Sequence, residues 1–434
     1  MNFSRIVIVW IGSLATSERG ITVRILTFSR REFGGALLAL GAQARRLGAS
    51  TTNIDQTLQM GIARRKIPAV AAMAATATQT FYTGAFGKRD GSSGLDVKPD
   101  SIFSIASMTK AIAATAAMQL VERGKVQLDE PASKHLPELG MAQVLHGYDA
   151  SGKPILRPPV KPVTLRHLLT HTSGFAYDTW NQEMFDYVQK VGNVVPAGMP
   201  ATLTLVFEPG TRWQYGYSMD WAGKLVEAVS GQTLEQYMQT HILQPLGMHD
   251  TSYIMTADKY DRVVSVYQKQ SDRTMQENPR KLPSPPKAYS GGGGLYSTTA
   301  DYVRFMQMIL NHGRAGKDRI LEAKTVDMMS TNQIGELGAG RLKTFIPQRS
   351  ADVDLHPGAV DKWGLGFLIN TKAYDSGRSA GSLAWAGVYN TFYWIDPKRG
   401  ICGTIMMQFL PFVDKEAVGL LGDFERSVYA NLPS

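Results

Sequence analysis

The chain reads Ser107-Met108-Thr109-Lys110 at the start of a helix-forming stretch, Ala111 to Glu122. Residues three apart share one face of a helix, so the ammonium of Lys110 can reach the hydroxyl of Ser107. A serine hydroxyl is a weak nucleophile until a nearby base takes its proton. A helix N-terminus adds unpaired backbone N–H groups and a positive dipole end, which suit a developing oxyanion. The stretch predicts a nucleophilic serine, although S-x-x-K alone also occurs on many surface helices.

A tyrosine further along the chain could complete the base. Tyr215 precedes an expected helix, Met219 to Val229, so its hydroxyl could face the helix that carries Ser107. A phenol normally titrates at about pH 10, and an adjacent ammonium favours its phenolate. Lys110 and Tyr215 together could therefore supply a base that neither provides alone. A tyrosine that only packs is the alternative, because the chain has seventeen.

A third motif, Trp385-Ala386-Gly387-Val388, ends a late expected strand. A strand edge beside the serine would offer the backbone N–H of Val388 as an oxyanion donor, with the N–H of Ser107 as the other. An ordinary tryptophan of a sheet is the alternative for this motif taken alone.

The order of elements predicts a split domain. An N-terminal helix (53–65) and a hairpin come first, a helical segment follows, and strands and a helix (414–431) end the chain. We expect a mainly antiparallel sheet with helices on its faces. The expected strands are Ala69 to Thr78, Thr80 to Gly87, Trp363 to Asn370, Ser382 to Ala386, Asn390 to Asp396 and Ile401 to Gln408. Thr164 and the pair Thr233 and Gln236 are expected helix caps, and Gln268 to Tyr289 an exposed loop.

Together the motifs resemble the serine β-lactamase and penicillin-binding-protein superfamily, most closely the class C-like family VIII carboxylesterases. The resemblance runs from about residue 53 to 431. The family's Y-x-N or Y-x-x box falls at Tyr215 to Tyr217, and its W-x-G box at Trp385 to Gly387. Phrases between the boxes also match, at Leu168 to Gly174, Phe207 to Gly210 and Gly291 to Asp301.

The resemblance implies an α+β, β-lactamase/transpeptidase-like fold, with a mainly antiparallel sheet flanked by helices and an inserted, mostly helical domain. Residues 51–130 with 286–434 would form the split α/β domain, and residues 131–285 the helical one. Residues 1–50 are set apart as a leader.

The resemblance also implies a reaction that needs no cofactor and no metal. Ser107 attacks a carbonyl while Lys110 and Tyr215 remove its proton, an acyl-enzyme forms, and water releases the acid. Ser107, Lys110 and Tyr215 are the expected catalytic residues, and the N–H groups of Ser107 and Val388 the oxyanion hole. Expected substrate-binding residues are Tyr217, Trp385, Ala386 and Gly387.

Two departures from the β-lactamase pattern favour uncharged, short- to medium-chain esters. Tyr217 replaces an asparagine that binds the amide side chain of a β-lactam, and Trp385 replaces a lysine that attracts the substrate carboxylate. A β-lactamase or D-alanyl-D-alanine carboxypeptidase is the alternative, and weak β-lactam hydrolysis remains open. A non-catalytic penicillin-recognition module is a third possibility, against which the retained Ser107, Lys110 and Tyr215 argue.

Charge and composition give no indication of a partner other than a small ester substrate. The first fifty residues hold seven arginines and two glutamates, so they carry +5 of the net charge of +9. The rest shows no basic stripe with interleaved aromatics, which argues against nucleic acid. No apolar run is long enough for a stable membrane insertion. The only cysteine, Cys402, is expected in a buried strand as a structural thiol. Oligomeric state is not predicted.

The N-terminus has the layout of an export signal. Ser29-Arg30-Arg31-Glu32-Phe33 is followed by a short apolar stretch and by Ala42-Gln43-Ala44, a pattern that resembles twin-arginine signals. A periplasmic or secreted location is expected, and a cytoplasmic one with an N-terminal extension is the alternative.

Three weaker signals are set aside. Gly216 to Asp220 misses the last glycine of a G-x-S-x-G elbow. His167 and His171 lie one helical turn apart, but no third metal ligand accompanies them. Gly291 to Gly294 lacks the Gly-Lys-Ser/Thr of a phosphate loop, and predicts a flexible or tightly packed turn.

Overall fold

A computed structural model describes residues 5–8, 26–29, 53–192, 195 and 201–433. The chain divides into two compact units, residues 1–54 with 433–434, and residues 55–432. In the first unit, β1 (Arg5–Ile8) and β2 (Leu26–Ser29) pair in antiparallel fashion. The predicted export signal lies mostly outside the described residues and stays a prediction.

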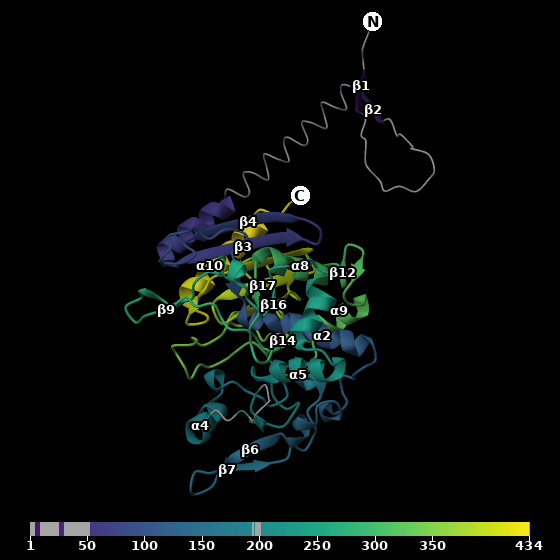
Figure 1. Ribbon diagram of the computed structural model, residues 1–434, viewed down its shortest axis with the longest axis vertical. Helices are drawn as coiled ribbons and strands as arrows, with labels where there is room; N and C mark the ends of the chain where they lie inside the picture. The colour runs from purple at the N-terminus through teal and green to yellow at the C-terminus, as the bar shows by residue number, and fades with distance from the viewer. Residues whose placement is uncertain (1–4, 9–25, 30–52, 193–194, 196–200, 434) are drawn as a thin grey trace. The chain divides into compact units, whose positions relative to one another are not determined.

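The second unit is built around a seven-stranded sheet of order β14-β15-β16-β17-β18-β3-β4 (Figure 1). Every neighbouring pair is antiparallel, as the sequence predicts. The sheet joins both ends of the unit, because β3 pairs with β18. The strands are β3 (Ala69–Thr76), β4 (Thr80–Gly87), β14 (Lys362–Trp363), β15 (Leu368–Ile369), β16 (Leu383–Gly387), β17 (Thr391–Asp396) and β18 (Ile401–Met406).

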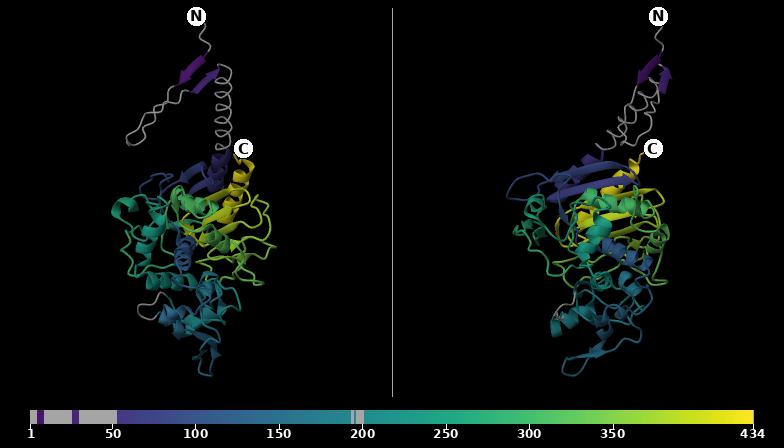
Figure 2. Two further views of the ribbon diagram at one scale, coloured as in Figure 1. Left: turned by 90° about the vertical axis from the view of Figure 1, so that its right-hand side faces the viewer. Right: turned by 45° about the vertical axis from the view of Figure 1, so that its right-hand side comes forward.

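Helices cover both faces of this sheet (Figure 2). Consecutive residues of a strand point to opposite faces, and Tyr393 and Trp394 of β17 show which helix covers each one. Tyr393 packs on Tyr302 of α8 (Thr299–Leu310), with ring centroids 5.0 Å apart. Trp394 packs on Phe424 of α10 (Lys415–Ala430) at 5.7 Å.

Two predictions about the strands are wrong in detail. The predicted strand Trp363 to Asn370 is two short strands, because the chain turns between them: Gly366 has a φ of +97°, which favours glycine. The predicted exposed loop carries a small hairpin of β9 (Tyr267–Lys269) and β10 (Met275–Glu277), and β9 also pairs in parallel with β19 (Phe409–Leu410).

The remaining elements surround the sheet and fill the middle of the chain. Residues 53–65 are helical, and the predicted cap at Thr164 and capping box of Thr233 with Gln236 are both present; Thr164 also forms a capping box, with His167. The predicted division between an α/β and a helical domain stays a prediction. The helices are α2 (Thr109–Glu122), α3 (Leu165–Leu169), α4 (Gln182–Val191), α5 (Ser218–Ser230), α6 (Leu234–Met238), α7 (Ala257–Tyr260) and α9 (Ala323–Met329). The 3-10 helices are η1 (Ala106–Met108), η2 (Ala132–Lys134), η3 (Pro137–Met141) and η4 (Asp178–Trp180), and η5 (Gln239–Leu243) is a π-helix. The other strands are β5 (Phe103–Ser104), β6 (Gln143–Tyr148), β7 (Pro154–Arg157), β8 (Thr204–Leu205), β11 (Tyr296–Ser297), β12 (Arg314–Ala315) and β13 (Asp318–Arg319).

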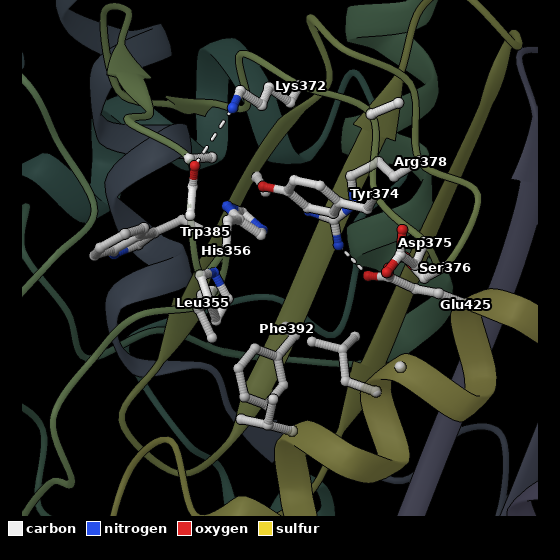
Figure 3. A pocket seen from close by; sticks show the side chains of 18 of the residues that line it. Leu355, His356, Lys372, Tyr374, Asp375, Ser376, Arg378, Trp385, Phe392 and Glu425 are labelled. Atoms are coloured by element: carbon white, nitrogen blue, oxygen red, sulfur yellow. Dashed lines mark hydrogen bonds and ion pairs between the residues drawn. The ribbon is translucent and has the colours of Figure 1, made fainter.

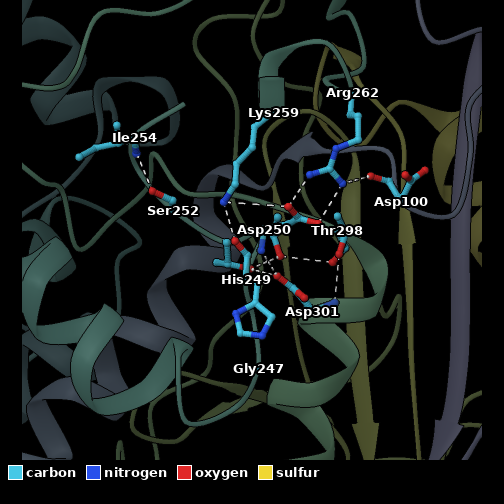
Figure 4. A network of polar contacts seen from close by, with 12 residues as sticks. Asp100, Gly247, His249, Asp250, Ser252, Ile254, Lys259, Arg262, Thr298 and Asp301 are labelled. Carbon is cyan, nitrogen blue, oxygen red and sulfur yellow. Dashed lines mark hydrogen bonds and ion pairs between the residues drawn. The ribbon is translucent and has the colours of Figure 1, made fainter. Parts of the chain in front are cut away.

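A polar network fixes the first turn of α8 to the loop that precedes α7 (Figure 4). The buried carboxylate of Asp301 accepts hydrogen bonds from the backbone N–H of Asp250 at 2.8 Å and from the hydroxyl of Thr251 at 3.0 Å. Asp250 itself pairs with Arg262. Within the described ranges, no helix combines the length and the apolar character needed to cross a membrane.

Candidate active site

Ser107 lies in a tight turn directly before a buried helix. Residues 106–108 form the 3-10 turn η1, and α2 begins at Thr109. Ala106 has a φ of +43°, a conformation that residues with a β-carbon rarely adopt. The turn leaves Ser107 half-buried, whereas Lys110, one turn later, is only 1 % exposed. A substrate can therefore reach the hydroxyl while the amine stays enclosed.

The side chain of Lys110 contacts three acceptors. Its Nζ lies 3.1 Å from Ser107 Oγ, 3.3 Å from Tyr177 Oη and 2.6 Å from the carbonyl oxygen of Gly292. Each of these three oxygens can accept an N–H from the amine. The predicted contact between Ser107 and Lys110 is present, and the other two contacts hold the amine in place.

Tyr215 lies beside the amine, but its hydroxyl points elsewhere. The ring centroid is 4.7 Å from Lys110 Nζ, within the range of a cation–π contact. Its hydroxyl accepts a hydrogen bond of 3.0 Å from Nε1 of Trp385. The structure thus brings the three predicted side chains together, with Trp385 rather than Lys110 bonded to the phenol.

The phenol that does contact Lys110 belongs to Tyr177, which the sequence reasoning missed. The Tyr177 ring packs edge-on against Tyr215 and Tyr217, with centroids 5.4 and 4.4 Å away. Burial, with the charge of Asp220 next in importance, raises the pKa of Tyr177 well above its usual range. The hydroxyl is therefore protonated at ordinary pH. Tyr177 could have been suspected from the sequence because it lies three residues after Leu168 to Gly174, a segment that matches the family.

A buried carboxylate, Asp220, is the second residue that the sequence reasoning missed. It lies in the first turn of α5 and accepts a hydrogen bond from Ser290 Oγ. Burial raises the pKa of Asp220, while the charge of Lys110 and the bond from Ser290 oppose that rise. In the sequence, Asp220 stood out only as the last residue of the stretch Gly216 to Asp220, which lacks the final glycine of the G-x-S-x-G motif.

Two backbone N–H groups near the serine are free to bind an oxyanion. Within the described ranges, neither Ser107 nor Val388 has an acceptor for its backbone N–H. Val388 directly follows β16, whose last residue, Gly387, is so close to the serine turn that a β-carbon there would lie 2.3 Å from the carbonyl oxygen of Ile105. This contact sets the end of β16 against η1, as the predicted oxyanion hole requires.

The predicted substrate-binding residues differ in accessibility. Tyr217 is half-buried at the edge of the aromatic cluster, and burial followed by the charges of Asp178 and Asp220 raises its pKa to about 12. Trp385 and Ala386 are 4 % and 1 % exposed, and Gly387 is buried. Only Tyr217 of this group offers a substantial surface to a substrate; Trp385 acts on Tyr215.

His171 is a buried packing residue. Its ring contacts Trp213, Tyr215 and Trp363, and neither of its nitrogens has a hydrogen-bond partner within the described part of the chain. Burial, with the charge of Lys110 next, lowers its pKa well below the usual value. Among the described residues no group of three His, Cys, Asp or Glu side chains could hold a metal ion.

A hollow of about 380 Å³ lies elsewhere, between the sheet and α10 (Figure 3). Its walls include His356, Tyr374, Phe392 and the ion pair of Arg378 with Glu425, but not Ser107 or Lys110. Since the guanidinium is already paired, the hollow presents no free charge from this pair. Trp385 also lines the hollow, so the hollow borders the serine site without containing its nucleophile.

Comparisons with known proteins identify the family of the chain. A family described as Beta-lactamase matches residues 54–422, so the chain belongs to that family. It has the fold of the serine β-lactamase and penicillin-binding-protein superfamily, and it is a serine enzyme of the acyltransferase and hydrolase class within it.

Its relatives divide between transfer and hydrolysis. Monacolin J acid methylbutanoyltransferase of Aspergillus terreus is 31 % identical, over 87 % of this chain and 95 % of its own length. Lovastatin esterase of Penicillium rubens is 30 % identical, over 87 % and 98 %. The LovD6 variant of simvastatin synthase from Aspergillus terreus has a TM-score of 0.76 at 30 % identity, covering 88 % of this chain and 95 % of its own.

Proposed function

We propose that the protein cleaves carboxylic esters of short to medium chain length through an acyl-enzyme on Ser107. The observation that carries this proposal is the 3.1 Å contact between Ser107 Oγ and Lys110 Nζ, in a turn where the serine is accessible and the amine enclosed. A positioned base typically contributes a hundred- to ten-thousandfold in rate. Tyr215 supports this assignment because its ring lies against the same amine.

The reaction proceeds in two halves. Ser107 Oγ forms a bond to the carbonyl carbon, and its proton passes to the pair of Lys110 and Tyr215. The resulting oxyanion accepts hydrogen bonds from the N–H groups of Ser107 and Val388. The ester C–O bond then breaks, and the alkoxide leaves with the proton from the same pair. In the second half water attacks the acyl carbon, and Ser107 recovers its proton as the acid leaves.

Transfer of the acyl group to an alcohol is the second candidate. It differs only in the nucleophile of the second half, so the same residues serve it. The names of the relatives favour it: they include a methylbutanoyltransferase as well as an esterase, both matched over nearly their whole length.

Uncharged acyl donors suit the site better than β-lactams. The position where β-lactamases of the family hold a lysine is Trp385, and its indole N–H is occupied by Tyr215. Lys110 is 1 % exposed and already contacts three oxygen atoms of the protein, so it is not available to form an ion pair with a substrate carboxylate.

The test compares purified enzyme on p-nitrophenyl butyrate and on nitrocefin, with Ser107→Ala beside it. We expect ester cleavage that Ser107→Ala abolishes, and slow or no turnover of nitrocefin. Mass spectrometry after a fluorophosphonate should place the label on Ser107. Rapid nitrocefin turnover without ester cleavage would overturn the esterase assignment, and a label elsewhere would remove the nucleophile. Adding an alcohol and measuring ester product against free acid separates transfer from hydrolysis.

A further inference from the structure

The charge of Lys110 is not balanced by a direct ion pair. Among the described residues its three partners are a serine hydroxyl, a tyrosine hydroxyl and a backbone carbonyl, and none carries a negative charge in the states described above. A buried charge is costly unless an opposite charge compensates it. The compensating negative charge should therefore lie behind the three groups that contact Lys110 directly.

Asp220 occupies that position. Gly292 links it to Lys110, because the Gly292 carbonyl accepts from Lys110 Nζ while a β-carbon on Gly292 would lie 2.5 Å from Asp220 Oδ2. Only a glycine lets the chain pass between the amine and the carboxylate. Ser290 donates a hydrogen bond to Asp220 Oδ1, and the carboxylate also interacts with the hydroxyl of Tyr177, which itself contacts Lys110.

We propose that Asp220 is a positioning residue whose carboxylate is the buried counter-charge of the Lys110 ammonium and keeps the resting site in its charged form. The proposal rests on the proposed function of Ser107 and Lys110. It goes beyond it by assigning the protonation state of the amine to a residue outside the three motifs.

No other carboxylate competes for this role among the described groups around the amine. The helix α5 contributes Asp220, and the segment before it contributes Tyr215 and Tyr217. The segment after α3 contributes Tyr177, and the end of α3 contributes His171, which burial and the charge of Lys110 keep neutral. Asp178 and Arg349 act on Tyr217 and pair with each other.

The same charge separates the roles of the two tyrosines. Burial and the negative charge of Asp220 raise the pKa of Tyr177, so its hydroxyl keeps its proton. Tyr177 can therefore position the amine of Lys110 but not take a proton from Ser107. Tyr215 instead accepts a hydrogen bond from the indole N–H of Trp385 with its hydroxyl and contacts the amine with its ring. The two tyrosines therefore contact Lys110 through different atoms.

The test is the pH dependence of kcat/KM for p-nitrophenyl butyrate in Asp220→Asn, which keeps the shape and removes the charge. Loss of a nearby negative charge makes loss of a proton from the site easier. We expect the limb of the profile that rises with pH to move to lower pH by about one unit. The pH at which kcat/KM rises does not depend on the fraction of folded enzyme, so it can be measured even in a partly unstable variant. Asp220→Ser, expected to shift in the same direction, serves if the asparagine variant is insoluble.

The matched control is Asp301→Asn, another buried carboxylate with a raised pKa, whose partners are Asp250, Thr251 and Arg304. It should lower stability and leave the limb in place. An unmoved limb in Asp220→Asn, with Ser107 still labelled by a fluorophosphonate, would overturn the counter-charge while leaving the proposed function intact. Absence of that label in the unsubstituted enzyme would overturn the proposed function itself.

Discussion

The indole of Trp385 is the clearest case of a side chain whose role depends on one atom. Its ring is packed against Trp363 and Tyr215, at 4.9 Å from each, so it looks like an ordinary core residue. Its Nε1, however, donates to the hydroxyl of the proposed base. The packing and the hydrogen bond can be separated by a substitution that keeps a ring.

Trp385→Phe should retain most of the packing and lose the N–H. A net hydrogen bond is worth about 1 kcal/mol, so we expect kcat/KM for p-nitrophenyl butyrate to fall by about five- to tenfold. Trp221→Phe is the control, because its Nε1 donates to the carbonyl of Thr202 at 3.3 Å, away from the serine. An equal fall in both variants, after correction for folded fraction, would contradict a special role of Trp385.

At this scale the sequence predicts contacts that are local and misses those that are not. Ser107 and Lys110 are three residues apart, so helical geometry alone brings them together. Tyr177 is 67 residues from Lys110 and is one of seventeen tyrosines. Its contact depends on how the segment between α3 and η4 packs against α2, which no spacing in the sequence encodes. The order of the motifs found Tyr215 but could not show which atom its hydroxyl would meet.

The element that decides the site is the end of β16, which lies against the turn that carries Ser107. Gly387 permits this approach: a β-carbon would be 2.3 Å from both the carbonyl oxygen of Ile105 and Thr391 Oγ1. The strand itself was predicted, at Ser382 to Ala386, within one residue of its observed bounds. The split of Trp363 to Asn370 into β14 and β15 was not, since a glycine at positive φ can end a strand or simply lie within one.

Gly387→Ala should force the end of β16 away from η1 and displace the N–H of Val388. Loss of one oxyanion donor typically costs about a hundred- to a thousandfold in kcat, and overpacking about 1–3 kcal/mol of unfolding free energy. Kinetics on an ester and urea unfolding measure the two effects. Gly140→Ala, whose β-carbon would meet Ser133 at an ordinary 3.4 Å, should change neither appreciably. Full activity of Gly387→Ala would contradict the assigned oxyanion hole.

On the scale of the whole molecule, the sheet is assembled from both ends of the second unit. The pair β3 and β18 joins residues 69–76 to residues 401–406, and helices α8 and α10 cover the two faces of the sheet at β17. The antiparallel character and the flanking helices were predictable from the order of elements. The strand order was not, because pairing between distant strands is a property of the packed core.

Acid should destabilise the fold through His171. Its folded-state pKa lies well below the unfolded value, so the unfolded chain binds more protons. Stability is full above the unfolded pKa of about 6.5 and falls as pH drops below it, by up to about 1.4 kcal/mol per pH unit. His171→Phe should remove this contribution. Urea unfolding between pH 7.5 and 5 should give a shallower slope for the variant, and parallel curves would contradict the expectation.

Cys402 offers a direct reading of global unfolding. It is the only cysteine, lies fully buried on β18, and burial raises the pKa of its thiol. Reaction with a disulfide reagent should therefore require opening of the sheet, and be at least about a thousandfold slower than in denatured protein. The rate should rise with urea in step with loss of ellipticity. Fast labelling without denaturant would show that β18 opens locally.

The joining of β3 to β18 has a consequence for synthesis of the enzyme. The ribosome makes the nucleophile in the first quarter of the chain, yet the strand that completes the sheet beside it is among the last segments to emerge. Domains fold as units once their sequence is available. A nascent or prematurely terminated polypeptide would thus carry Ser107 without its oxyanion donor on Val388, and acyl chemistry would begin only after release of a finished chain.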